Sequence, residues 1–173
     1  MTYGWQLTQE YLKSVLFYDP LTGVFKWISK PTPRSHKAVI GKIAGDKDVR
    51  GYMRIGIKGH RYPSHRLAWL YMTGEWPKNE IDHINHNKSD NRWTNLRDVP
   101  HQDNLKNQVV SLTNKSGVIG VSWDRERDKW YACIKFDGKS ISLGRHKKLE
   151  DAKIAIDIAK RKYSYHPNHG EDL

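Results

Sequence analysis

A polar stretch at residues 109–117 interrupts the hydrophobic patterning of this chain and limits the folds that it can adopt. Its sequence, VVSLTNKSG, follows neither the helical period nor the alternation of a half-buried strand. We interpret this stretch as a linker. The sequence therefore predicts two domains, at residues 1–108 and 118–165, followed by a tail at residues 166–173.

The first predicted domain begins with short helices and strands. Tyr11, Leu12, Val15 and Leu16 fall on one face of a helix that starts near Thr8. Turn residues then separate short strands, and an apolar helix follows a serine that suits an N-cap. The predicted elements are a turn at Asp19, Pro20 and Gly23, strands at residues 24–28, 42–44, 52–57 and 61–63, and a helix at residues 65–74 capped by Ser64.

The charge of the chain points to a polyanionic partner. Thirty Lys and Arg residues stand against 19 Asp and Glu residues, a formal net charge of +11, and nucleic acid is the leading candidate. Cys133 is the single cysteine, which excludes an internal disulfide framework and a cysteine-based zinc site. No apolar run reaches membrane-spanning length and no signal-peptide core is present, so we expect no membrane partner and a cytoplasmic location.

Residues 80–108 hold the groups most suited to catalysis. Their pattern predicts a strand ending in Asp82 and His83, a long asparagine-rich loop, a strand at residues 96–99 and a helix at residues 100–108. Phosphodiester hydrolysis needs a base for water and a cation beside the phosphate, and a hard divalent ion prefers oxygen ligands. Asp82 can bind such an ion, His83 can act as the base, and an amide oxygen on the facing helix can complete the ligands.

This segment resembles the HNH nucleases of phages and introns, in the group whose last motif residue is asparagine. The resemblance rests on Asp82-His83, Asn95 and Asn104, and with the flanking sequence it covers roughly residues 8–108. An isolated Asp-His pair is most often a solvated turn, so the interpretation depends on the combined spacing and flanking match.

The resemblance implies a ββα-metal finger at residues 80–108 and a role for each motif residue. Asp82 and Asn104 are expected to bind one divalent ion, Mg²⁺ or Mn²⁺, while His83 activates water. Asn95 is expected to pin the loop and to orient His83 by hydrogen bonding. These roles make His83 and Asn95 the expected catalytic residues.

Many HNH proteins brace this finger with zinc held by cysteines, which this chain lacks, so we expect no structural zinc. Packing by Trp93, Leu96 and the helix at residues 65–72 is expected to replace it. Arg97 is a further candidate for phosphate binding. His65 is expected to make structural bonds at the start of its helix.

The second predicted domain has the pattern of a three-stranded antiparallel sheet packed on one helix. Strands are predicted at residues 119–123, 129–136 and 140–143, with a hairpin turn at Asp137-Gly138 and a helix at residues 149–163. Alternation along the middle strand predicts that Ala132 and Ile134 face the helix, while Cys133 and Lys135 lie on the open face.

Residues 119–159 resemble the APETALA-type DNA-binding domain of plant ethylene-response factors, which also occurs fused to HNH nucleases. The matching residues are Gly120, Val121, Trp130, Ala132, Ile134, Leu143, Gly144, Glu150, Asp151 and Ala152. The resemblance implies DNA contacts from Ser122, Trp123, Arg125, Arg127, Lys129, Cys133, Lys135, Ser140 and Ser142. Trp123 and Trp130 are expected to add aromatic bulk to the open face, although a core position at the sheet edge suits Trp130 equally well.

These patterns together predict an α+β protein that is a metal-dependent DNA endonuclease of the HNH homing type. Its C-terminal sheet is expected to bind double-stranded DNA as a monomer, for a nick or a double-strand cut, in the host bacterial cytoplasm if the chain is phage-encoded. Two alternatives stay open: a DNA-binding regulator without cleavage activity, and an RNA-binding protein, since surface aromatics and basic charge also suit single strands.

Overall fold

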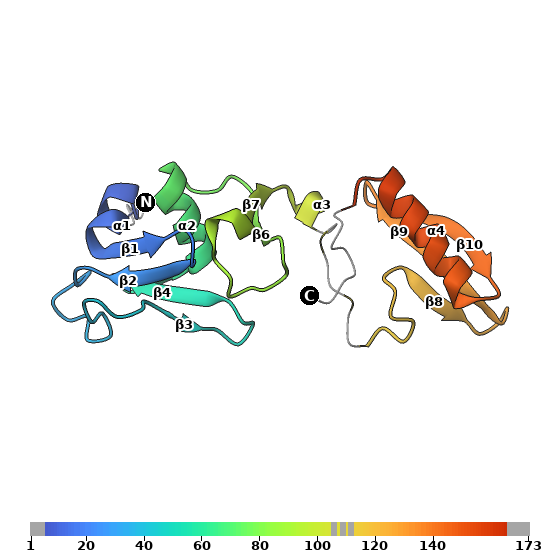
Figure 1. Ribbon diagram of the computed structural model, residues 1–173, viewed down its shortest axis with the longest axis horizontal. Coiled ribbons are helices and arrows are strands. Elements are labelled where there is room, and N and C mark those ends of the chain that lie inside the picture. The colour runs from blue at the N-terminus through green and yellow to red at the C-terminus, as the bar shows by residue number, and fades with distance from the viewer. Residues whose placement is uncertain (1–5, 105–106, 108–109, 111–112, 166–173) are drawn as a thin grey trace, which may run out of the picture. The chain divides into compact units, whose positions relative to one another are not determined.

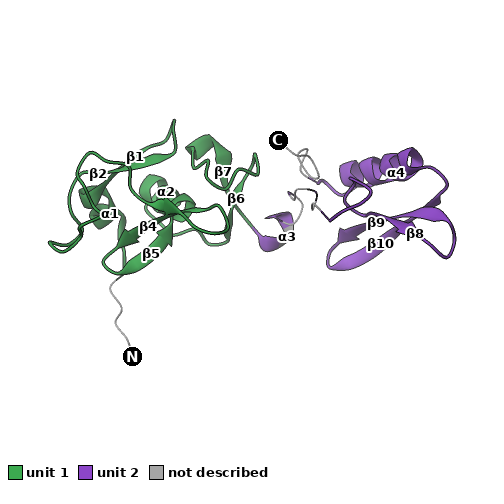
Figure 2. Ribbon diagram, turned by 90° about the horizontal axis from the view of Figure 1, so that it is seen from below, with its two compact units in different colours: residues 1–99 green, residues 100–173 purple. Residues whose placement is uncertain are grey.

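The computed structural model describes residues 6–104, 107, 110 and 113–165. The chain divides into two compact units, residues 1–99 and 100–173 (Figure 2). Both units combine helices with small antiparallel sheets, which is the mixed architecture that the sequence predicts. None of the described helices is long and apolar enough to cross a membrane.

In the first unit, helix α1 (Gln9–Val15) leads directly into a β-hairpin. Thr8 caps the helix by accepting a backbone hydrogen bond at 3.3 Å. Strand β1 (Leu16–Asp19) pairs antiparallel with β2 (Val24–Trp27) across the predicted turn. The expected helical position of Leu16 is therefore wrong, and β1 was not predicted, because the apolar face of the helix continues into the strand without a break.

A three-stranded sheet follows in the order β3 (Asp46–Lys47), β4 (Met53–Ile57) and β5 (His60–Pro63). Ile55 and Ile57 are fully buried on one side of β4, as the alternation predicts. The strand predicted at residues 42–44 is wrong. Only an isolated bridge between Lys26 and Ile43 forms there. The strand that pairs with β4 begins later in the chain, at Asp46.

Helix α2 (Ser64–Thr73) packs against α1, β4 and β5. Its N-cap is Pro63, whose extended backbone precedes the first turn, and Ser64 lies buried inside the helix. The predicted Ser64 cap is therefore wrong, since the helix begins one residue earlier than expected. Gly74 ends the helix with a left-handed backbone at φ +84°, as expected for a glycine C-cap.

One hydrophobic core joins these elements to the hairpin that carries the asparagine-rich loop. That hairpin consists of β6 (Glu80–His83) and β7 (Leu96–Val99), and Ile81 and Leu96 bring it into the core. Each large apolar side chain that is fully buried contributes about 1.5–3 kcal/mol. The fully buried ones include Leu12, Leu16, Tyr18, Ile55, Ile57, Leu67 and Leu70.

Helix α3 (His101–Asn104) begins after Pro100, so strand, loop, strand and helix follow one another in the predicted order. Residues 105, 106 and 108 of the predicted helix lie outside the described residues. The described end of the predicted linker is folded: Ser116 is buried and donates from Oγ to the carbonyl of Val121 at 2.8 Å.

The second unit contains an antiparallel sheet of order β10-β9-β8 with one helix across a single face (Figure 1). Its elements are β8 (Val121–Asp124), β9 (Lys129–Phe136), β10 (Lys139–His146) and α4 (Leu149–Lys162). Asp137 and Gly138 have φ values of 49° and 73°, as a two-residue hairpin turn with left-handed residues requires. The predicted three-stranded sheet on one helix is confirmed, although β8 starts later and β10 ends later than expected.

Candidate functional site

Asp82 and His83 lie at the buried end of β6. Their exposed fractions are 7% and 5%, which is unusual for two ionisable side chains next to each other in sequence. The register places Arg97 opposite Asp82 and Leu96 opposite His83. Because a buried polar group costs free energy unless it is hydrogen-bonded, the partners of this pair determine its chemistry.

Asn95 holds the two ends of the asparagine-rich loop together. Its Oδ1 accepts the backbone N–H of Asn85 at 2.9 Å, and its Nδ2 donates to Asn85 Oδ1 at 2.9 Å and to the Asp90 carbonyl at 2.8 Å. Hydrogen bonding from Arg92 is the main cause that lowers the pKa of Asp90 to about 2. The three hydrogen bonds of Asn95 are the kind that its predicted loop-pinning role requires.

The hydrogen bond to the His83 ring comes from Asn91, a residue that the sequence analysis did not single out. Oδ1 of Asn91 lies 3.2 Å from Nε2 of His83, and Nδ2 of Asn91 donates to the Ser89 carbonyl at 3.3 Å. This second bond orients the amide, so Nε2 of His83 is the donor and the lone pair of the neutral ring is on Nδ1. Asn95 bonds within the loop instead, so its expected hydrogen bond to His83 is corrected to Asn91.

Asn91 is supported by the first β-hairpin of the chain. Tyr18 Oη donates to the Asn91 carbonyl at 2.7 Å, and burial raises the pKa of this phenol. Gly23 has a φ of +73°, and a Cβ on it would lie 2.4 Å from the carbonyl carbon of Asn91. The loop therefore packs directly on Gly23. Any other residue at this position would displace the loop.

Packing also braces the loop from α2. The rings of Trp69 and Trp93 are 5.1 Å apart, and Leu96 is buried in the core of the first unit. These contacts are the ones predicted to take the place of a zinc site. Among the described residues, no three His, Cys, Asp or Glu side chains are grouped as metal ligands.

The His83 ring packs against two other rings, which also contact each other. Its centroid is 6.0 Å from that of Tyr52 and 5.1 Å from that of His65. Burial lowers the pKa of His83, while the Asn91 hydrogen bond and Asp82 act in the opposite direction. Burial also lowers the pKa of His65 to about 3, and its Nδ1 has no hydrogen-bond partner among the described residues. Both imidazoles are therefore neutral near pH 7, which is the form a general base needs.

Arg97 pairs with Asp82 through two charge-assisted hydrogen bonds. Its Nε and Nη2 lie 2.8 Å and 2.6 Å from Oδ2 of Asp82. A carboxylate at this position is the hard oxygen donor that a divalent ion prefers. Contact of Arg97 with phosphate stays a prediction, as does the ligand role of Asn104, which ends α3 in the other unit.

Residues 62–106 match the family model for HNH endonuclease. The match shows that this segment is similar to HNH endonucleases. Asp82, His83, Asn91 and Asn95 all fall inside this HNH segment. Protein 3.8 of Escherichia phage T7 is 34% identical over 76 residues, which are 43% of this chain and 63% of that protein. The chain thus spans under two thirds of that phage protein. No solved structure matches this chain.

Outside the HNH segment, the open face of the second-unit sheet carries most of the predicted DNA contacts. Val121 and Ala132 are register partners buried against α4, so the alternate residues face away from the helix. The predicted contact residues on this face are Ser122, Lys129, Cys133, Lys135, Ser140 and Ser142. Arg125 and Arg127 are exposed in the turn between β8 and β9.

The expected open-face position of Trp123 is wrong. Trp123 and Trp130 are register partners with ring centroids 4.9 Å apart, and cross-strand partners share a face of the sheet. That face is the one on α4, because Trp130 packs on the cluster that contains Ala132 and Ile156. Trp130 is thus a partly buried core residue on the middle strand, and Trp123 lies beside it on the same face, 42% exposed.

Arg145 joins the open face and was missed by the sequence analysis. A β-bulge between Ser142 and Gly144 shifts the alternation, so that Arg145 pairs with Tyr131. Its guanidinium lies 5.0 Å from the centre of the Tyr131 ring, and its Nε donates to Asp124 at 2.7 Å. An arginine stacked on a tyrosine is a surface that suits nucleic acid.

Proposed function

We propose that the chain is a metal-dependent DNA endonuclease of the HNH homing type, which hydrolyses phosphodiester bonds. One observation carries the proposal: the buried Asp82-His83 pair, with the imidazole oriented by Asn91, lies inside the segment that matches the HNH endonuclease model. A buried neutral histidine with a fixed tautomer is an effective base for water.

His83 accepts the proton of the attacking water at Nδ1 in this proposal. Asp82 and Asn104 would hold one divalent ion, Mg²⁺ or Mn²⁺, and a carboxylate with an amide oxygen is a donor set that fits such an ion. When bound, the ion supplies neutralisation of charge at the phosphate and the leaving oxygen. Arg97 positions the Asp82 carboxylate, and Asn95 holds the two ends of the loop together.

The second unit supplies double-stranded DNA binding in the same proposal, with one chain bound to its site. Support comes from the net charge of +11 and from the likeness of residues 119–159 to the APETALA-type domain. The proposed contacts include Arg145 on the open face and exclude Trp123, which lies on the helix side. Such contacts to phosphates position the duplex, while contacts to base edges give specificity.

Cleavage of supercoiled plasmid with Mg²⁺ or Mn²⁺ tests the proposal, beside a chelator control. Metal-dependent nicking or linearisation that is lost in His83→Ala supports it. Asn79→Ala, an exposed side chain just before β6, serves as the control that keeps activity. A protein that binds duplex DNA but leaves it intact in both metals would instead be a DNA-binding regulator. Preferred binding of single-stranded RNA would favour the RNA-binding alternative.

A further inference from the structure

The first unit contains a basic groove that is separate from the residues of the candidate active site. The groove encloses about 620 Å³ between the loop at residues 32–38 and the hairpin of β4 and β5. Its cationic lining residues are Arg34, Lys37, Arg54, Lys58 and Arg61. Asp46 is the single acidic residue among the described residues that line it.

Two of these cations have acidic partners, and the five cationic lining residues outnumber Asp46 and Asp48, which leaves the groove with an excess of positive charge. Arg54 pairs with Asp48 at 2.8 Å, and Arg61 pairs with Asp46. Lys58 places its Nζ 4.1 Å from the centre of the Tyr11 ring, a cation–π contact that leaves the charge in place. Arg34 and Lys37 are exposed on the loop.

One side of β4 connects the active site with this groove. Tyr52 precedes the strand and contacts His83, and Arg54 and Gly56 follow on the same side because the alternate residues Ile55 and Ile57 are buried. Lys58 comes next, in the turn after β4, and lines the groove with Arg54 and Gly56. At about 3.3 Å per residue, this side of the chain extends roughly 20 Å. One DNA strand presents about six phosphates over such a length of helix axis.

We propose that the basic groove binds the phosphate backbone of duplex DNA beside the bond that is cut. The inference rests on the proposed function and adds a binding surface on the catalytic unit itself. Lys and Arg contacts to phosphate carry no base information, so the groove holds DNA of any sequence. It therefore fixes the duplex against His83 whatever site the other unit reads.

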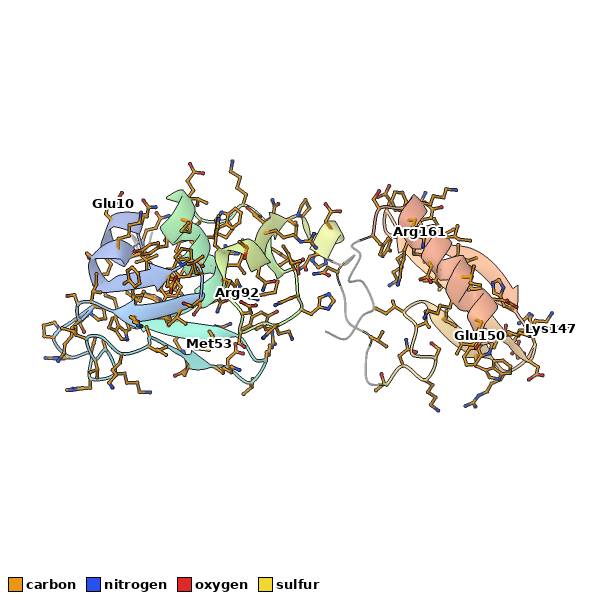
Figure 3. All side chains as sticks on the ribbon, in the orientation of Figure 1. Glu10, Met53, Arg92, Lys147, Glu150 and Arg161 are labelled. Carbon is orange, nitrogen blue, oxygen red and sulfur yellow. The ribbon has the colours of Figure 1, made fainter. Side chains whose placement is uncertain are left out.

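The test compares two charge-reversal proteins, each as the full chain and in the presence of a chelator. One carries Arg34→Glu with Lys37→Glu in the groove. The other carries Lys153→Glu with Arg161→Glu at exposed positions of α4, which changes the net charge equally. Figure 3 labels Arg161 on this helix. Binding of a labelled duplex is measured by fluorescence anisotropy over a range of salt concentrations.

The groove protein is expected to bind about tenfold more weakly, and the slope of log Kd against log salt to fall by about two. The α4 protein is expected to stay within about threefold of wild type. Equal Kd and slope for the two proteins would overturn the inference, even where the wild type cleaves DNA.

A second pair of variants adds a side chain to the groove without removing one. A Cβ on Gly56 meets no atom within 4 Å, and its φ is not positive, so both Gly56→Gln and Gly56→Glu are expected to fold. Binding is expected to weaken from wild type to Gln and further to Glu. If the wild type binds the duplex without cutting it, the proposed function fails while these variants still decide the inference; if it binds no duplex, both fail.

Discussion

The amide of Asn91 faces the imidazole of His83 across 3.2 Å, and it fixes which ring nitrogen can act as a base. The same residue accepts the Tyr18 hydroxyl on its carbonyl at 2.7 Å. Asn91 is 2% exposed, so neither bond is exchanged readily with water. The proposed chemistry of the loop thus depends on one buried asparagine.

Replacing Asn91 is expected to affect cleavage more than binding. Asn91→Leu leaves Nε2 of His83 without its acceptor, and loss of such a supporting hydrogen bond lowers activity by roughly 10–100-fold. Asn91→Asp keeps the acceptor and adds a charge that raises the pKa of His83, so its cleavage profile moves to higher pH. Cleavage rates from about pH 5 to 9 and the Kd for duplex DNA are measured for both. An unshifted profile in Asn91→Asp would contradict the positioning role.

Removal of Arg97 is expected to destabilise the protein and to make its stability depend on metal. Arg97→Gln leaves the Asp82 carboxylate, whose side chain alone is 8% exposed, without this arginine. The loss costs about 2 kcal/mol, because Arg97 is itself partly exposed. A divalent ion at Asp82 would restore part of this loss. Thermal unfolding with chelator and with saturating Mg²⁺ measures both effects. Equal Mg²⁺ stabilisation of wild type and Arg97→Gln would argue against Asp82 as a ligand.

The first unit is expected to lose stability as the pH falls below about 6.5. The pKa of His65 is about 3 in the folded chain, below its value in the unfolded chain. The unfolded chain therefore binds more protons in this window, and stability falls by up to about 1.4 kcal/mol per pH unit. The lowered pKa of His83 acts in the same direction. Urea unfolding near pH 7 and pH 5 should show a smaller loss for His65→Phe than for wild type, whereas exposed His60→Phe should match wild type.

Gly120 is expected to tolerate no side chain. A Cβ there would lie 2.2 Å from the Cys133 carbonyl oxygen, and the backbone φ is +84°. Gly120→Ala should destabilise the second unit by more than about 2 kcal/mol, because strain and a backbone clash add together. Gly117→Ala is the matched control, since its φ is +66° but no atom lies within 4 Å of the added Cβ. Similar unfolding midpoints for the two variants would show that the close approach is unimportant.

The open sheet face predicts opposite outcomes for Arg145 and Trp123. Arg145→Ala should weaken duplex binding about tenfold and reduce the salt slope by about one, as loss of a phosphate contact does. Trp123→Leu should leave the Kd within about threefold, because that ring lies on the helix side beside Trp130. Anisotropy titrations measure both. The reverse order would place DNA on the other face of the sheet.

Regular alternation and strong turn signals made much of the fold predictable from sequence. The middle strand β9, the Asp137-Gly138 turn and helix α4 have local patterns that agree with their tertiary setting. Strand β1 has no such local pattern, because its four residues follow helix α1 directly, with no turn residue between them. The position of Arg145 depends on a one-residue bulge, which reverses the parity of every later side chain and leaves no mark in the alternation.

The sequence was enough to predict the ionisable residues of the candidate site. It was not enough to predict the residues that orient them. Asp82 and His83 stand out as adjacent groups at a strand end, and Asn95 at the far end of the loop. Asn91 resembles the surrounding asparagines in sequence, and only the tertiary contacts with Tyr18 and Gly23 distinguish it. Trp123 was misplaced because its face depends on pairing register rather than on composition.

The support that Gly23 gives to Asn91 determines whether the HNH segment can be moved into another protein. Residues 62–106 contain Asp82, His83, Asn91 and Asn95, yet the surface on which their loop rests belongs to the hairpin of β1 and β2, far earlier in the chain. Transplanted alone into another scaffold, those residues would lose the contacts of Tyr18 and Gly23 with Asn91, and with them the support that orients the His83 ring. The smallest part of the chain that can carry the proposed activity is therefore the whole of the first unit together with helix α3, which ends in Asn104.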